Sequence, residues 1–187
     1  GRDDVDRFGA IRLVTVDLRF GRRVIDIDDA AWTSNDLFHI PPPVHAIGDV
    51  DNDGFNDVLV AFTSQDNNGV AAIVYGGPDG QPSRQLLVKP ADEIVNAAFF
   101  GYGGGAIGDV NGDGFNDFAV VGFQPGFIGT AVSLYFGSDG DRQAVSEPDA
   151  VVPIEGFRTV VAAAGEFNRL PADPRAIDDL FVGTESN

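Results

Sequence analysis

The sequence predicts an all-β fold built from repeated sheets, and three observations support this expectation. Two acidic loops with almost the same sequence lie sixty residues apart. A short apolar run rich in strand-forming residues follows each loop and ends at turn residues, as expected of buried strands. The composition, with 24 Gly and 11 Pro among 187 residues and 43% hydrophobic residues, favours short strands and tight turns over helices.

The net charge limits the partners that the chain can have. It is −17 at pH 7, from 29 acidic and 12 basic residues. Phosphate backbones and anionic membrane surfaces would be repelled, so we expect no binding to nucleic acid or to such membranes. No apolar run approaches the roughly 20 residues that span a bilayer. The absence of Met, even at position 1, indicates a processed or truncated product, and both a removed signal peptide and a cut from a longer chain fit this.

The two acidic loops have the pattern of a site for a hard cation. The first, residues 48–57, reads GDVDNDGFND, and the second, residues 108–117, reads GDVNGDGFND. Counted from the first Asp, each has oxygen-bearing side chains at positions 1, 3, 5 and 9 and a Gly at position 6. Ca²⁺ accepts several hard oxygen ligands at flexible distances, whereas Mg²⁺ requires a stricter geometry. We therefore expect two Ca²⁺ sites, with the sharp bends at Gly54 and Gly114.

This spacing names the expected ligands. In the first loop they are Asp49, Asp51, Asp53, the Phe55 carbonyl and Asp57. In the second loop they are Asp109, Asn111, Asp113, the Phe115 carbonyl and Asp117. An EF-hand would need a bidentate Glu at position 12 and flanking helices, but position 12 is Val60 or Val120 inside a predicted strand. The loops are therefore not EF-hands.

The repeat extends beyond the loops. Predicted strands over residues 58–62 and 118–123 are followed by others over residues 69–76 and 129–137, again sixty apart, and residues 9–16 fall on the same register. The expected repeat units are about 9–68, 69–128 and 129–187, so the chain starts and ends in the middle of a repeat. A unit of about sixty residues suits a four-stranded propeller blade. We expect a β-propeller or part of one, with about three blades.

The last repeat carries a degenerate loop. Its candidate ligands are Glu166, Asn168, Asp173 and Asp179, but an insertion with two prolines separates them. We expect a structural turn without metal there. Beyond it, we expect residues 180–183 to share a sheet with residues 9–16, within one chain or between two, because an unpaired strand edge invites aggregation. Three blades are fewer than the usual 4–8, so we expect a fragment, self-association, or docking on other subunits.

Residues 106–120, AIGDVNGDGFNDFAV, resemble the FG-GAP repeat, the unit of integrin α-chain β-propellers. Residues 101–105 lie where that family has its Phe-Gly and Gly-Ala-Pro signature, and three prolines at residues 41–43 replace it in the first repeat. The resemblance covers nearly the whole chain and is most specific at the loops. It implies calcium between strands one and two of a blade, on the propeller rim, and an extracellular, periplasmic or cell-surface setting.

The resemblance does not imply one activity, because integrin subunits, lectins and polysaccharide lyases carry similar repeats. No nucleophile motif or phosphate-binding glycine loop is present, so we expect no enzymatic activity. The expected role is a binding or assembly module for protein partners. A lectin-like carbohydrate binder and the non-catalytic part of a polysaccharide-degrading enzyme remain alternatives. A sugar platform would use aromatic residues such as Trp32, Phe38, Phe99, Phe100 and Tyr102.

Overall fold

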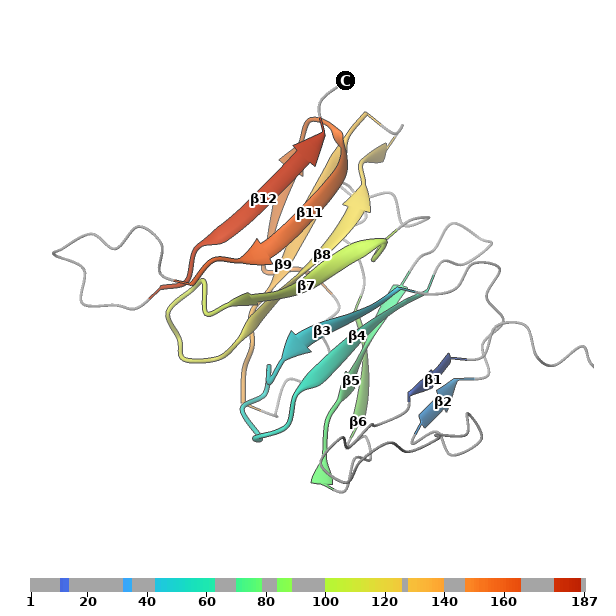
Figure 1. Cartoon of the computed structure of the whole chain (residues 1–187), viewed down its shortest axis with the longest axis vertical. Coiled ribbons are helices and arrows are strands. Elements are labelled where there is room, and N and C mark those ends of the chain that lie inside the picture. Colours follow the sequence, from blue (N-terminus) through green and yellow to red (C-terminus); the bar gives the residue numbers. More distant parts are fainter. Residues whose placement is uncertain are drawn as a thin grey trace, which may run out of the picture.

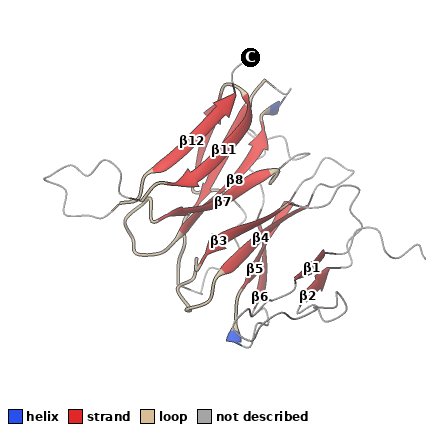
Figure 2. Cartoon of the chain, viewed as in Figure 1, coloured by secondary structure: helices blue, strands red, loops and turns tan. Residues whose placement is uncertain are grey.

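The structure is a computed structural model that describes nine segments of the chain. They are residues 11–13, 32–34, 43–62, 70–78, 84–88, 100–125, 128–139, 147–165 and 177–185. Their regular elements are twelve β-strands, shown in Figures 1 and 2, and none of these elements is an α-helix. The expected all-β fold is confirmed. No helix in the described segments is long and apolar enough to cross a membrane.

Two four-stranded antiparallel sheets form the centre of the molecule. The first sheet has the strand order β3-β4-β5-β6. Its strands are β3 (Val44–Gly48), β4 (Asp57–Phe62), β5 (Val70–Tyr75) and β6 (Arg84–Val88). The second sheet has the order β10-β9-β8-β7. Its strands are β7 (Gly103–Gly108), β8 (Asp117–Phe123), β9 (Thr130–Tyr135) and β10 (Ala150–Ile154).

Two shorter sheets flank this centre. The N-terminal sheet pairs β1 (Ile11–Leu13) with β2 (Trp32–Ser34). The third sheet pairs β11 (Phe157–Ala163) with β12 (Leu180–Glu185). Figure 1 shows the four sheets as a row, with these two short sheets at its opposite ends. This arrangement is compatible with a partial propeller of about three blades, in which the first and last sheets each have two strands among the described residues.

The core lies between successive sheets, and β8 shows how it is built. Phe118 and Val120 belong to a buried cluster that β8 shares with the first sheet, whereas Ala119 and Val121 belong to a cluster with the third sheet. All four side chains are at most 2% exposed. The Phe118 ring also stacks on Tyr135, with 5.0 Å between ring centroids. A middle sheet therefore buries both faces, which a sheet at the end of a row cannot do.

The third strand of each complete sheet departs from the sequence-based alignment by one residue. The ladders pair Val58 with Val74 in the first sheet and Phe118 with Tyr135 in the second. Second-strand positions are thus 60 residues apart, whereas third-strand positions are 61 apart. The difference arises because β8 pairs over seven residues, one more than the six residues of β4. Because strand side chains alternate between faces, a fixed period of 60 assigns the third strand to the wrong face.

The expected pairing of residues 9–16 with residues 180–183 is wrong within this chain, as far as the described residues go. There β1 pairs with β2, and β12 pairs with β11, in separate sheets. The physical reason is the row in Figure 1: packed sheets separate the two short sheets, and three blades are too few to bring the ends of a ring together. The form of the pairing between two chains stays a prediction.

Gly137, which follows β9, provides a test of this close packing. A Cβ there would overlap the Asn116 carbonyl oxygen, whereas a Cβ at Gly183 would meet nothing within 4 Å. We expect Gly137→Ala to lower the free energy of unfolding by roughly 1–3 kcal/mol, because backbone atoms cannot easily yield. The control, Gly183→Ala, should change it by less than about 0.5 kcal/mol. Urea unfolding followed by circular dichroism measures both, and equal losses would contradict the prediction.

Candidate metal centre

Each acidic loop connects the first two strands of a complete sheet and is shaped by its first Asp. Asp49 accepts hydrogen bonds of 3.0 and 2.9 Å from the backbone N–H groups four and five residues later. Asp109 accepts bonds of 2.7 to 3.0 Å from the N–H groups three, four and five residues later. The expected bends are present, because Gly54 and Gly114 have φ angles of 92° and 94°. Only Gly adopts these angles readily, which explains the Gly at position 6 of each loop.

The last Asp of each loop is buried, and its carboxylate is hydrogen-bonded to two separate parts of the chain. Asp57 and Asp117 are both 0% exposed. One carboxylate oxygen of Asp57 accepts from the N–H of Val50 at 2.9 Å, within the loop, and the other from the N–H of Gly76 at 2.8 Å, after β5. Asp117 accepts the two equivalent bonds, both at 2.8 Å. Each closing carboxylate therefore ties its loop to the end of the third strand.

Without a bound cation, ionisation of these two carboxyl groups is unfavourable. Burial raises the pKa of Asp57 to about 6, against the two backbone hydrogen bonds, which lower it, and the charges of Asp51 and Asp49 raise it further. The pKa of Asp117 is raised to about 6 in the same way, by burial first and then by Asp113 and Asp109. A bound cation would offset both the burial and the repulsion.

The first loop brings three of its expected ligands together. Single carboxylate oxygens of Asp49, Asp51 and Asp57 all lie within 4.8 Å of one another. One carboxylate oxygen of Asp51 is also buried. Such converging hard oxygens fit Ca²⁺, which tolerates several carboxylates in one site. Asp53 is not in this group; it is exposed, and its carboxylate accepts the N–H of Phe55 at 2.8 Å.

The second loop is arranged differently around Asn111. The Asn111 amide donates to the Asp113 carboxylate at 2.8 Å, and its oxygen accepts from the Asp113 N–H at 2.9 Å. Asp113 also accepts from the N–H of Phe115 at 2.9 Å, as Asp53 does from Phe55. This loop thus has one carboxylate fewer, and a local amide–carboxylate bond in its place. The ligand roles of the Phe55 and Phe115 carbonyls, and the complete ligand sets, remain predictions.

Consecutive loops are also bonded to each other, through residues that sequence reasoning missed. The Asn116 side chain donates to the Asp49 carbonyl at 3.1 Å. In the next repeat, the Asp178 carboxylate accepts from the Asp109 N–H at 2.9 Å, and the Asp178 N–H donates to the Asp109 carbonyl at 2.8 Å. Both bridging residues immediately precede the closing Asp of their repeat. The repeated Asn before the closing Asp in both loops was the available signal.

The degenerate third loop is only partly described. Glu166, Asn168 and Asp173 lie outside the described residues. Asp179 exchanges backbone hydrogen bonds with residues 164 and 165, at 2.9 and 2.8 Å. Of the aromatic residues considered for a sugar platform, Phe100 is 0% exposed and belongs to the core. Tyr102 is partly buried and stacks on Phe123 at 4.9 Å, while Phe38, Phe99 and the Trp32 side chain lie outside the description.

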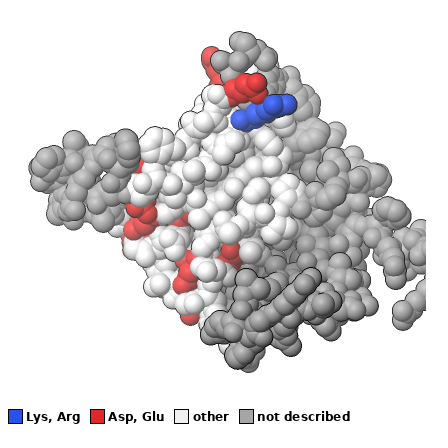
Figure 3. Space-filling view, viewed as in Figure 1, with Lys and Arg blue, Asp and Glu red and all other residues white. Residues whose placement is uncertain are grey.

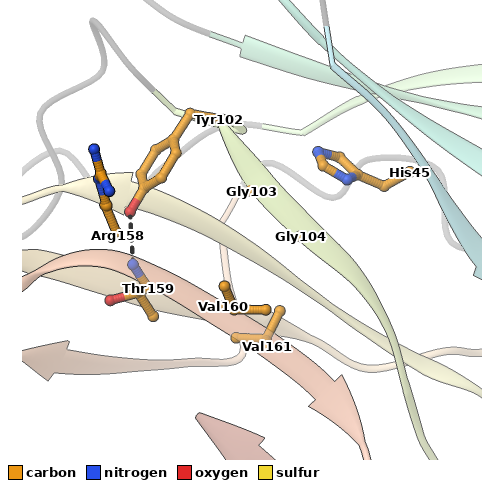
Figure 4. A pocket seen from close by; sticks show the side chains of 8 residues that line it. All are labelled: His45, Tyr102, Gly103, Gly104, Arg158, Thr159, Val160 and Val161. Atoms are coloured by element: carbon orange, nitrogen blue, oxygen red, sulfur yellow. Dashed lines mark hydrogen bonds between the residues drawn. The ribbon is translucent and has the colours of Figure 1, made fainter. Parts of the chain in front are cut away.

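A separate cavity of about 340 Å³ lies where the first strands of three consecutive sheets meet. It is lined by His45, by residues 102–104 and by residues 158–161 (Figure 4). The Tyr102 hydroxyl accepts the Thr159 N–H at 3.4 Å, and His45 contacts the Gly101 carbonyl at 3.3 Å. Arg158 is occupied by an exposed ion pair with Glu185 at 3.4 Å. The cavity holds none of the expected metal ligands.

Among the described residues, Figure 3 shows acidic side chains over the loops between β3 and β4 and between β7 and β8. Among the residues whose side chains are described, Arg158 is the one Lys or Arg. Crowded carboxylates of this kind attract divalent cations and repel other anions.

Comparison with known proteins identifies integrin α chains among the relatives of this chain. The chain matches no protein-family model. It is 30% identical over 157 residues to integrin alpha-PS2 of Drosophila melanogaster, which is 76% of this chain and 11% of the relative. It is 29% identical over 142 residues to integrin alpha-2 of Mus musculus, which is 68% of this chain and 12% of the relative. It is 38% identical over 79 residues to integrin alpha-PS3 of Drosophila melanogaster, 40% of this chain and 7% of the relative.

The chain therefore spans about a tenth of the length of these relatives. The aligned segments cover much of the chain. In the structure, both four-stranded sheets have an acidic loop between their first two strands. The chain is thus related to integrin α chains, through repeats of the integrin α FG-GAP type.

Proposed function

We propose that the chain is a calcium-stabilised, non-enzymatic module that acts outside the cytoplasm by binding protein partners. The observation that carries this proposal is the convergence of Asp49, Asp51 and Asp57 within 4.8 Å in a loop between two buried strands. Such a cluster repels itself until a cation neutralises it, so metal binding and folding are linked. The second loop is a second site of the same kind, and the degenerate third loop is a structural turn.

The relatives support the setting and the kind of partner. They are integrin α chains, and the resemblance implies an extracellular or cell-surface module whose rigid sheets present surfaces for adhesion or assembly. The negative charge agrees with such a role, because it disfavours nucleic acid while leaving protein surfaces available. The metal loops brace the strand pairs, so calcium acts on stability rather than on chemistry.

Removal of metal is the direct test of this proposal. Treatment with excess chelator should lower the melting temperature, because the clustered carboxylates are then uncompensated. Calcium should restore the melting temperature better than magnesium at the same concentration, because the loops are flexible oxygen cages. Thermal unfolding with elemental analysis of the chelated sample measures this. An unchanged melt in a sample shown to be free of metal would refute the proposal.

The two loops should differ in affinity. The first offers four carboxylates and the second three, because Asn111 replaces one of them. More ligand charge generally gives tighter Ca²⁺ binding. Calorimetric titration of Asp53→Ala, which leaves the second loop intact, and of Asp113→Ala, which leaves the first intact, separates the sites. We expect the tighter site to survive in Asp113→Ala, and equal or reversed affinities would contradict the ranking.

The raised pKa values of Asp57 and Asp117 predict a pH dependence that metal reverses. In chelator, the folded state holds these protons more tightly than the unfolded state does. The resulting stability is full below the unfolded pKa of 3.8 and is lost as pH rises through about 6. Lowering the pH from about 7.5 to 5 should therefore stabilise the metal-free protein by on the order of 1 kcal/mol for each carboxyl.

Calcium needs the ionised carboxylates, so the gain in stability from added calcium should shrink over the same pH range. Urea unfolding at both pH values, with and without calcium, measures the two effects. The control is the double variant Asp57→Asn and Asp117→Asn in chelator, which should lose this part of the pH dependence. An unchanged pH dependence in the double variant would assign the effect to other groups.

A further inference from the structure

The second acidic loop contains an Asn-Gly pair that the first loop lacks. Position 3 is Asp51 in the first loop and Asn111 in the second, and Gly112 follows Asn111. Gly112 has a φ angle of 76°, and Asn52 at the same position of the first loop has one of 57°. Both loops therefore turn through the left-handed region at this residue. The second loop differs by an amide in place of a carboxylate and by the Gly after it.

An Asn-Gly pair is the dipeptide most prone to lose its side-chain amide. The reason is steric, because the nitrogen of a Gly can approach the preceding Asn side chain without obstruction from a Cβ. Asn111 is partly exposed and Gly112 is exposed. A Cβ on Gly112 would lie 3.2 Å from Cγ1 of Ile177, so the residue also has a close neighbour. The pair therefore lies at the surface, where water can take part in a reaction.

The hydrogen bonds of the loop place a base and an oxyanion donor around this pair. The Gly112 N–H donates to a carboxylate oxygen of Asp109 at 2.7 Å, a distance at which a carboxylate can accept the proton of an attacking nitrogen. The Asn111 side-chain oxygen accepts the N–H of Asp113 at 2.9 Å, and this donor would stabilise negative charge on that oxygen. The nucleophile and the electrophile of a deamidation are thus both activated by neighbours within the loop.

We propose that Asn111 is a site of spontaneous deamidation in the metal-free chain and that bound calcium protects it. The Gly112 nitrogen attacks the side-chain carbonyl carbon of Asn111, and a C–N bond forms as the Gly112 proton passes to Asp109. The bond from that carbon to the side-chain nitrogen then breaks, and the nitrogen takes the proton and leaves as ammonia. Water opens the resulting succinimide ring to give Asp or isoaspartate, and nothing is oxidised or reduced.

Calcium would protect Asn111 because it uses the same groups, and this part of the inference rests on the proposed function. A cation bound by the expected ligands occupies the Asp109 carboxylate, which is then no longer available as a base, and it holds the Asn111 oxygen. Opening of the ring to Asp gives the second loop a carboxylate at position 3, as in the first loop. Isoaspartate instead lengthens the backbone by one carbon. The modification therefore alters the second loop in chains that have lacked the metal.

The first test compares the rate of deamidation in chelator and in calcium. The full chain is incubated at neutral pH and physiological temperature, and peptide mapping by mass spectrometry follows each Asn. Conversion of Asn111 should be several-fold faster in chelator than in calcium. Asn68, which precedes Gly69, is the internal control, because it has the same dipeptide outside the acidic loops. General loosening of the metal-free chain would affect both sites, so a chelator-to-calcium ratio at Asn111 no higher than at Asn68 would overturn the proposal.

The second test removes the base. In chelator, Asp109→Asn should slow the conversion of Asn111 several-fold, because an amide cannot accept the Gly112 proton. The matched control is Asp49→Asn, at the same position of the first loop, which should leave the rate at Asn111 unchanged. Equal rates in the two variants, or a faster one in Asp109→Asn, would overturn the role of Asp109. Circular dichroism checks that both variants fold, and the comparison of chelator with calcium in the natural chain does not depend on them.

Calcium titration separates this inference from the proposed function. Asn111→Asp imitates the Asp product, and in the Asp53→Ala background it should tighten calcium binding at the second loop several-fold, because the loop gains a carboxylate. Equal or weaker binding would overturn this consequence of the modification. A chain that binds calcium but converts Asn111 no faster in chelator would overturn the deamidation proposal alone. A chain that binds no calcium, yet converts Asn111 faster than Asn68 and slows in Asp109→Asn, would overturn the calcium proposal alone.

Discussion

The structure depends on a buried carboxylate that closes each acidic loop. Asp57 lies at the start of β4 with no exposed surface, and its two oxygens bond backbone groups of two other elements. A buried charge is costly unless it is hydrogen-bonded and compensated, and the surrounding acidic side chains add to the cost. The fold therefore places its most constrained charge where several carboxylates converge, and a divalent cation is the simplest compensation for that arrangement.

The sheets also depend on one another for their stability. A four-stranded sheet with apolar residues on both faces cannot stand alone in water, and β8 buries Phe118 and Val120 against one sheet and Ala119 and Val121 against another. Repeat proteins gain their stability from such interfaces between neighbours. The exposed Val160 marks the point where this series of interfaces stops within the described residues.

Much of the fold could be predicted from the sequence, because short local motifs mark each repeat. The loop spacing placed both acidic loops and the bends at their glycines, and the apolar runs placed the buried strands. The face of the third strand could not be predicted from a period of 60, because one extra residue in β8 reverses the alternation. The bridges from Asn116 and Asp178 join residues at least 67 positions apart, and only the folded geometry brings them together. The separate placement of Asp53 also follows from local hydrogen bonds that spacing does not encode.

The hydrogen bonds between loops have a consequence for the coupling between the two acidic loops. Asn116 holds the backbone of Asp49, and it precedes Asp117, which closes the second loop. A cation that ordered the first loop would therefore also restrict the second, and it would meet part of the entropy cost of a second binding event. Such coupling is reciprocal, so it would appear as positive cooperativity between sites that share no ligand atom.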